Sequence, residues 1–544
     1  MMQEERVDEN QSAQIENIGD FDAIVIGSGT AGLFAGNVLV KKGYRVLLVE
    51  KHTVPGGYTT NFERKGFRFD ASNHFMVGCE PGGMAYENLA KIDAQDRVEF
   101  ITHKSSACIV DESRGITYTP AGGMDEHIKQ LTMLFPHEKK GIRSFYQEYG
   151  SLLEGLFDHL REHAEQGIEE AGEITDVMEE YLGLKGKSAR DCMDGHISDP
   201  ELMGMLAGMM TGALGVTYDE LDATMFVMGD VSSRVGGRGM YYPKGGSGHM
   251  TGVLADIFQE RGGTLLLNTE VTEIGFSEGL ATGIIARKGK SQQISASGRC
   301  VIAASDLTAL ATRLCPDGTF PPDYVKAIEE RIPGRSCVML FLGLDIDLRE
   351  RGITAFHYVR TWGEAATPSL IAEIAKGGDY SKLPRAHVAI FSNVDPSCCP
   401  PGKSLIITMD LADPDLFERS LDPGRKRGKA YKELKRGLTT QLVNNAAKAL
   451  DMPDLEEHIE VLEVATPITL ERYTGNRGGS FVGWKWSADQ AADGHFPQQS
   501  PIENLFLCGH WVSPGGGVNF VMTSGVNAAE SADAYLQGSR PGGA

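Results

Sequence analysis

The chain has few features that would suit a nucleic-acid partner or a disulfide framework. Its 52 Lys and Arg residues are outnumbered by 74 Asp and Glu, which gives a formal net charge of −22. Nucleic-acid binding needs cations clustered over a broad face, so this balance argues against it. The nine cysteines form no C-x-x-C pair and no metal-ligand spacing. We therefore expect free thiols in a reducing compartment, with the neighbours Cys398 and Cys399 adjacent by chance rather than redox-active.

Long apolar runs are also missing. No run reaches the length of a membrane span, and Met1 to Asp20 lack the basic and apolar regions of a signal peptide. We expect a disordered lead over residues 1–20, a cytoplasmic location and at most peripheral membrane contact. The one basic run, Arg425 to Lys429, is best explained as a solvated helix end. Contact with an anionic membrane surface is the alternative.

The length and composition predict a globular protein of two interleaved domains. A chain of 544 residues exceeds what one core usually serves, and 41% of the residues are apolar. Phe21 to Ile26 is a short apolar run typical of a buried parallel strand. Leu33 to Lys42 has helical character, and Arg45 to Glu50 forms the next strand. The sequence therefore begins with a βαβ unit.

A glycine motif follows the first predicted strand directly. In residues 27–32, Gly27 permits a tight turn, Gly29 lets the backbone approach a pyrophosphate, and Gly32 allows close packing of helix and strand. The helix N-terminus adds free N–H groups and the positive end of its dipole. Glu50, at the end of the next strand, suits both ribose hydroxyls of an adenosine and repels a 2′-phosphate. The unit therefore predicts a dinucleotide other than NADP.

The segment after Glu50 resembles the flavin-dependent amine oxidase and phytoene desaturase superfamily. The doublet Gly56-Gly57 stands six residues after the acid, as in that superfamily, where it runs beneath FAD. Residues 65–70 and His74 are similar to the G-[FY]-x-[FW]-D-x-[GS]-x-[HT] stretch of the same proteins.

The other end of the chain narrows the resemblance to the bacterial phytoene desaturase, carotenoid isomerase and retinol saturase group. Residues 504–529 resemble the C-terminal signature of that group, in which a strand, a Gly-Asp pair, a P-G-G-G loop and a last helix close over the flavin. Residues 242–246 match the Y-P-x-G-G turn of the group. Val271 is similar to its adenine-side valine, and residues 304–306 to its A-x-D loop.

The resemblance implies an α/β fold with non-covalently bound FAD. It consists of a Rossmann-type FAD-binding domain of the GR2 type, built from N- and C-terminal segments, and an inserted mixed α+β substrate domain. The expected segments are a lead (1–20), FAD-binding parts (21–140, 236–332 and 481–540), a helical lid (141–235) and the substrate domain (333–480). The implied cofactor-binding residues are Gly27, Ser28, Gly29, Thr30, Ala31, Gly32, Glu50, Lys51, Gly56, Gly57, Thr59, Thr60, Val271, Ser305, Gly509, His510, Gly516, Gly517 and Val518.

One position departs from the group. An acidic residue usually follows the glycine of the C-terminal strand, and here it is His510. We interpret it as a tolerated replacement, while a changed flavin environment, a catalytic histidine and a degenerate site stay open. The catalytic residues are unknown; His510, Tyr242 and His249 are the candidates.

The resemblance implies hydride transfer between flavin N5 and a carbon–carbon bond. The expected substrate is a long apolar polyene, isoprenoid or fatty-acid-like lipid, which is desaturated, saturated or isomerised. The methionines between Leu202 and Gly229 suit a lipid tunnel, although plain core is the simpler interpretation. With no second glycine loop for NAD(P)H, the electron acceptor is oxygen, a quinone or a soluble carrier. The alternatives are an amine oxidase-like enzyme and a non-catalytic prenyl-binding protein of the same fold.

Overall fold

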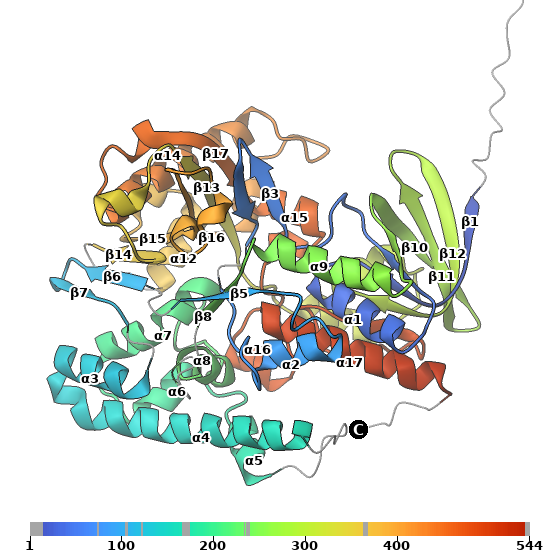
Figure 1. Cartoon of the computed structure of the whole chain (residues 1–544), viewed down its shortest axis with the longest axis horizontal. Coiled ribbons are helices and arrows are strands. Elements are labelled where there is room, and N and C mark those ends of the chain that lie inside the picture. Colours follow the sequence, from blue (N-terminus) through green and yellow to red (C-terminus); the bar gives the residue numbers. More distant parts are fainter. Residues whose placement is uncertain are drawn as a thin grey trace, which may run out of the picture.

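The computed structural model describes residues 15–72, 75–103, 107–120, 123–165, 175–232, 234, 240–362 and 368–538. Two seven-stranded sheets lie on opposite sides of the molecule, with a group of helices below the second (Figure 1). His74 of the predicted motif lies outside the described residues, as do residues 1–14 of the predicted lead. Strand β1 (Glu16–Ile26) begins inside that lead, so regular structure starts earlier than predicted.

The first sheet is built from both ends of the chain. Its order is β10-β11-β12-β1-β2-β9, and the C-terminal strand β18 pairs in parallel with β12. β1 lies between β12 and β2 and is parallel to both, with Ile24 and Val25 fully buried. The strands predicted at residues 21–26 and 45–50 are present as β1 and β2. The bounds are β2 (Val46–Val49), β9 (Thr264–Leu266), β10 (Thr269–Ser277), β11 (Leu280–Lys288), β12 (Gln292–Ala303) and β18 (Leu505–Leu507).

The helices α1 (Thr30–Lys41) and α17 (Val518–Leu536) join the two ends of the chain. They lie side by side against the first sheet, next to α9 (Ser247–Glu260) (Figure 1). The contact is close because Gly525 of α17 has no side chain. A Cβ there would lie 2.2 Å from the Ala31 carbonyl oxygen and 2.9 Å from Cβ of Phe34.

The second sheet has the order β17-β13-β16-β15-β14-β6-β7. Strands β6 (Ala107–Asp111) and β7 (Ile116–Tyr118) come from the segment 21–140, which was predicted to belong to the FAD-binding domain. β6 pairs in parallel with β14, so this part of the segment belongs to the second sheet. The other bounds are β13 (Ser336–Leu344), β14 (His357–Thr361), β15 (Arg385–Ile390), β16 (Ser404–Ala412) and β17 (Ile459–Ala465).

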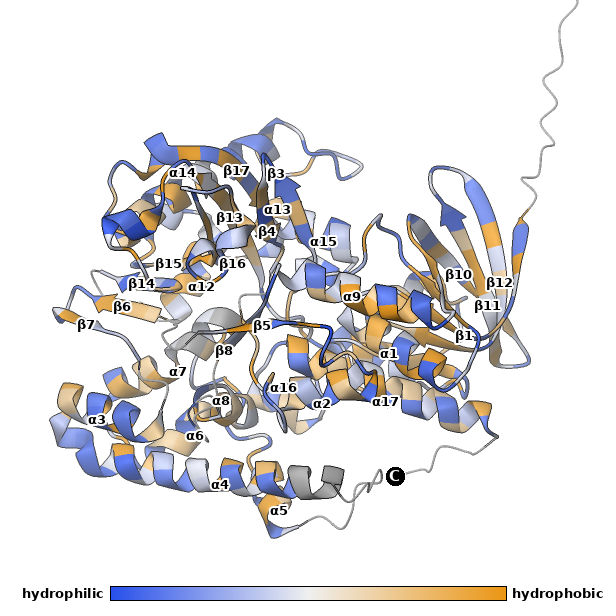
Figure 2. Ribbon diagram, in the orientation of Figure 1, coloured by the Kyte–Doolittle hydropathy of each residue, from blue (hydrophilic) through white to orange (hydrophobic). Residues whose placement is uncertain are grey.

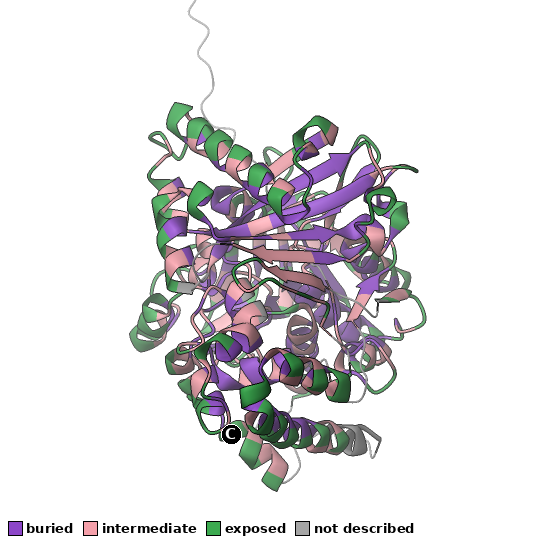
Figure 3. Ribbon diagram, turned by 90° about the vertical axis from the view of Figure 1, so that its left-hand side faces the viewer, coloured by how far each residue is buried: buried purple, intermediate pink, exposed green. Residues whose placement is uncertain are grey.

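Two further sheets have two antiparallel strands each. β3 (Asn61–Arg64) pairs with β4 (Phe67–Asp70), and β5 (Phe100–His103) pairs with β8 (Met240–Pro243). Strands of the second sheet are largely buried, while the helices around them expose one side (Figure 3).

The helical group contains α3 (Met124–Leu134), α4 (Lys139–Glu165), α5 (Asp176–Leu182), α6 (Ala189–Asp194), α7 (Pro200–Leu214) and α8 (Ala223–Asp230). Hydrophilic and hydrophobic residues alternate along α4, as its one-sided burial requires (Figure 2). Met203 and Met225 belong to the core of this group, which confirms the simpler interpretation of the methionine-rich segment. Among the described residues, no helix has the length and apolarity to cross a bilayer.

The remaining helices flank the sheets. They are α2 (Met84–Lys91), α10 (Leu307–Ala309), α11 (Pro322–Glu330), α12 (Pro368–Gly377), α13 (Pro414–Glu418), α14 (Lys429–Ala449), α15 (Pro467–Thr474) and α16 (Ala488–Ala492).

The α1–α17 contact predicts that Gly525→Ala destabilises the protein. The new methyl group would be forced against backbone, and overpacking of this kind costs about 1–3 kcal/mol. We expect a lower urea midpoint for this variant. Gly437→Ala in α14 is the matched control, since a Cβ on Gly437 would meet no atom within 4 Å and the midpoint should stay or rise. Equal midpoints for the two variants would contradict the close contact.

Candidate flavin site

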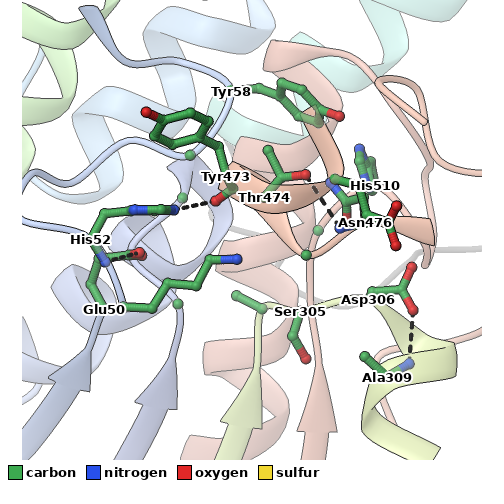
Figure 4. A pocket seen from close by; sticks show the side chains of 18 of the residues that line it. Glu50, His52, Tyr58, Ser305, Asp306, Ala309, Tyr473, Thr474, Asn476 and His510 are labelled. Atoms are coloured by element: carbon green, nitrogen blue, oxygen red, sulfur yellow. Dashed lines mark hydrogen bonds between the residues drawn. The ribbon is translucent and has the colours of Figure 1, made fainter. Parts of the chain in front are cut away.

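A cavity of about 1200 Å³ opens where β1 and β2 end. Ligands of parallel α/β sheets bind outside the carboxyl ends of the strands, and Ile26 and Val49 are the last residues of these two. Glu50 and His52 lie on one side of the cavity, and Asn476 and His510 lie on the other (Figure 4). The wall thus combines N-terminal, central and C-terminal segments.

The glycine loop has the geometry that its sequence predicts. Gly27 has φ +97°, and a Cβ on it would lie 2.8 Å from the Ala304 carbonyl oxygen. A Cβ on Gly32 would lie 2.0 Å from the Gly27 carbonyl oxygen, which would prevent α1 from packing on the loop. At Gly29 the corresponding space is empty to 4 Å and faces the cavity. Two glycines therefore serve packing, and the third leaves room for a ligand.

Two long helices begin at the cavity without a side-chain cap. The N-cap residues are Gly29 for α1 and Gly517 for α17, and neither carries a side chain that could accept from the first turn. The first backbone N–H groups of a helix have no partner within the helix. They and the helix dipoles therefore favour a ligand with negative charge or strong acceptors.

Glu50 fixes the loop to the second strand. Its Oε2 accepts hydrogen bonds from Ser28 N at 2.8 Å and from Ser28 Oγ at 3.0 Å, and its Oε1 accepts from His52 N at 2.9 Å. The side chain lines the cavity although only 7% of the residue is exposed. Beside it, burial lowers the pKa of Lys51, whose Nζ lies 3.4 Å from the Arg472 carbonyl oxygen.

The Gly-Gly doublet lies against the glycine loop. Gly56 N donates to Ser28 O at 2.9 Å, and a Cβ on Gly57 would lie 3.3 Å from Cα of Gly29. The hydroxyls of Thr30 and Thr59 are 2.5 Å apart and connect the start of α1 with the segment after the doublet. The doublet thus completes one wall of the cavity.

His510 forms part of the opposite wall. Burial lowers its pKa to about 4, so the imidazole is neutral at physiological pH. Its ring packs edge-on against Trp511 with centroids 4.9 Å apart, and the ring of Tyr58 lies 6.1 Å away. Trp511 is itself fixed, since its Nε1 donates to Asn476 Oδ1 at 2.8 Å. The histidine therefore sits in a rigid frame at the cavity surface.

The structure brings most of the predicted cofactor-binding residues together. Those that line the cavity are Gly27, Gly29, Thr30, Ala31, Glu50, Lys51, Gly56, Gly57, Thr59, Val271, Ser305, Gly509, His510, Gly517 and Val518. Ser28, Gly32, Thr60 and Gly516 lie behind this surface; a Cβ on Gly516, for example, would lie 2.1 Å from the Val482 carbonyl oxygen.

The other two catalytic candidates lie elsewhere. Tyr242 is buried outside the cavity lining, and its hydroxyl donates to Asp70. Asp70 Oδ1 accepts from Ser247 N at 2.9 Å and so caps α9. His249 is exposed on the first turn of that helix. These positions favour a structural role for Tyr242, and any catalytic role of the two remains a prediction without support from geometry.

Several cavity residues were not predicted. Phe75, Phe481, Val482 and Val521 form an apolar part of the lining, and Arg313 contributes a cation. These side chains come from connecting segments, from the π-helical turn 310–314 and from inside α17. Isolated apolar residues in such places carry no pattern in the sequence.

A family model described as flavin containing amine oxidoreductase matches residues 30–532. This chain belongs to that family. It is 24% identical over 534 residues to prolycopene isomerase 2 of an Oncidium hybrid cultivar, covering 97% of this chain and 86% of the relative. It is 25% identical to all-trans-retinol 13,14-reductase of Danio rerio, covering 90% and 82%. An oxidoreductase structure from Methanosarcina mazei aligns with a TM-score of 0.59 at 19% identity, covering 94% of this chain and all of that one.

The protein is an FAD-dependent oxidoreductase, and the cavity fits the cofactor. The open space at Gly29 and the two uncapped helices suit the pyrophosphate and the acceptor atoms of the flavin. Ser305 Oγ is buried in the lining and has no hydrogen-bond partner among the described residues. A buried hydroxyl of this kind is expected to pair with a bound ligand.

Gly29→Val tests the cofactor position. Its backbone at φ −61° and ψ 169° is accessible to valine, and the side chain would fill only cavity space. We expect FAD affinity to fall at least about tenfold, which corresponds to about 1.4 kcal/mol, with an unchanged unfolding midpoint of the apoprotein. Fluorescence titration with FAD measures the affinity. Gly123→Val, at an open N-cap position outside the cavity, is the control and should bind FAD normally.

The raised pKa of Asp70 predicts that the stability of the protein depends on pH. Burial raises its pKa from 3.8 to about 6, although the hydrogen bonds from Tyr242 and Ser247 oppose the shift. Because the folded protein holds the proton more tightly, the contribution of Asp70 is full below the ordinary pKa and is lost as pH rises through about 6. The loss amounts to at most about 3 kcal/mol at 1.36 kcal/mol per pKa unit. Asp70→Asn keeps both partners without titrating. Urea unfolding of the wild type and of Asp70→Asn from pH 4 to 7 should give a difference in unfolding free energy that changes with pH. A difference that stays constant would contradict the raised pKa of Asp70.

Proposed function

We propose that the protein acts on carbon–carbon bonds of a long apolar polyene, isoprenoid or fatty-acid-like lipid. The observation that carries this proposal is a cavity lining that contains both apolar side chains and cations. Phe75, Phe481, Val482 and Val521 supply apolar lining, whereas Lys51, Arg313, Arg425, Lys426, Arg427 and Arg472 supply cations. The cations suit the charged half of the cofactor, and the apolar side chains suit a hydrocarbon beside its ring.

The bound flavin would supply a hydride acceptor or donor at N5. The chain's own residues exclude water and hold the hydrocarbon. A base works best with a pKa near the working pH, and burial holds the pKa of His510 at about 4. His510 therefore fits a neutral hydrogen-bonding group at the cavity wall better than a general base. This supports the interpretation of the histidine as a tolerated replacement for an acid.

The names of two relatives favour a polyene among the proposed substrates. By name, one isomerises prolycopene and another reduces all-trans-retinol at the 13,14 position, so both act on polyenes. An amine substrate would carry a positive charge, and a free carboxylate beside the flavin ring would stabilise it. Asp306 in the lining instead accepts from Ala309 N at 2.8 Å and from Arg477 N at 3.0 Å. A prenyl-binding protein without chemistry would not need the intact glycine loop and Glu50.

The absorbance spectrum and an anaerobic assay test the proposal together. We expect oxidised-flavin bands that pass into the supernatant on heat denaturation, because nothing in the proposal requires a covalent link. Prolycopene and all-trans-retinol are the first substrates, each with oxidised and with reduced enzyme. Formation of an isomer, a saturated or a desaturated product supports the proposal. Turnover of amines but not polyenes, or a protein that takes up no FAD, would contradict it.

Oxygen, a quinone or a soluble carrier is proposed as the electron acceptor. The rates at which the three reoxidise the reduced enzyme would distinguish them. A cytoplasmic location is proposed from the free cysteines, which suit a reducing compartment. Peripheral membrane contact is proposed from the apolar character of the substrate.

A further inference from the structure

A dense group of cations borders the cavity in a chain that is otherwise strongly acidic. Residues 425–436 contain seven Lys and Arg and one Glu, whereas the whole chain has a formal net charge of −22. The segment runs from the loop before α14 into its first two turns. Its charge is therefore opposite to that of the protein as a whole.

Most of these cations face solvent. Arg425 and Lys426 are exposed and also line the cavity, so they stand at its mouth. Lys429, Lys432 and Arg436 are exposed along one side of α14, at the helical spacing of three and four residues.

Part of this charge is neutralised within the protein. Arg425 pairs with Glu418 and Glu471, at 2.9 and 2.6 Å. Lys435 is half-buried and donates to the Val464 carbonyl oxygen at 3.0 Å. Lys429 pairs with Glu433 of the same helix at 3.7 Å. Lys432 and Arg436 of α14 and Lys426 before it are the further exposed cations of the segment.

Two exposed apolar side chains belong to segments that border the cavity. Tyr473, which lines the cavity, is 56% exposed, and Val54 is 50% exposed. The Tyr473 ring packs on His52 with centroids 5.2 Å apart, which joins the 51–55 loop to the end of α15 (Figure 4). The exposed cation Arg472 stands beside them. Large exposed apolar residues next to clustered cations are typical of surfaces that contact lipid.

We propose that this surface, formed by residues 425–436, Arg472, Tyr473 and Val54, docks the protein on an anionic lipid bilayer. The cations would contact the headgroups, while Tyr473 and Val54 would enter the interface. An acidic protein partner would match the cations but would leave the two apolar side chains unexplained. The proposal rests on charge and exposure and does not depend on the chemistry inside the cavity.

Vesicle sedimentation of the purified holoprotein tests the proposal. We expect binding to phosphatidylcholine vesicles that contain phosphatidylglycerol, weaker binding in high salt, and none to phosphatidylcholine alone. The triple variant Lys429→Glu, Lys432→Glu, Arg436→Glu changes no residue that lines the cavity. It should lower partitioning at least about tenfold, since each cation near such a surface contributes on the order of 1 kcal/mol. Val54→Ser should weaken binding without altering its salt dependence.

A second triple variant separates local charge from total charge. Lys139→Glu, Lys140→Glu, Lys326→Glu makes the same change in net charge at exposed positions outside this surface, and it should bind like the wild type. The flavin spectrum of every variant checks folding independently of lipid binding. Equal losses in both triple variants, or no sedimentation of the wild type, would overturn the proposal. Retention of the wild type by polyglutamate but not by vesicles would overturn it in favour of an acidic protein partner.

Discussion

The close approach of α1 to the glycine loop is the contact on which the rest of the site depends. Gly32 lies so near the Gly27 carbonyl oxygen that any side chain would separate helix and loop. On its other side α1 touches α17 through Gly525, again at a distance that excludes a Cβ. Because α17 begins directly after its N-cap residue Gly517 beside the cavity, these contacts bring the C-terminal wall to the N-terminal one. The absence of side chains at Gly32 and Gly525 thus determines where the cavity walls meet and where a ligand can bind.

Much of this arrangement could be predicted because glycines and the acid at a strand end carry strong local signals. Gly27, Gly29 and Gly32 have separable tasks, and Glu50 stands at the predicted strand end, where it also holds Ser28. The placement of β6 could not be predicted. It pairs with β14, which lies far along the chain, and the choice between two sheets is made by tertiary contacts rather than by local pattern.

The Y-P-x-G-G turn shows that a motif can be recognised in the sequence while the contacts of its side chains are visible only in the structure. Tyr242 was a catalytic candidate, yet its hydroxyl is bound to Asp70, and the same carboxyl caps α9. Thr251 in that helix donates to the Thr59 carbonyl oxygen at 3.0 Å, and Thr59 contacts Thr30 at the start of α1. The turn is therefore linked to the glycine loop through α9, Thr59 and Thr30 and does not line the cavity itself. Sequence spacing identifies such residues but does not distinguish contact with a ligand from support of the residues that make it.

The positive groups at the cavity oppose the negative charge of the chain as a whole. A chain with so many carboxylates would repel a pyrophosphate unless local groups reversed the field, and the helix N-termini and cavity cations do so. On the opposite wall the buried imidazole of His510 is neutral, so it adds no charge near the apolar lining. A carboxylate at that position would have to be desolvated or paired, and Asp306, the nearby acid in Figure 4, already has two backbone partners. The histidine thus keeps a polar contact available beside the apolar lining without adding a second carboxylate.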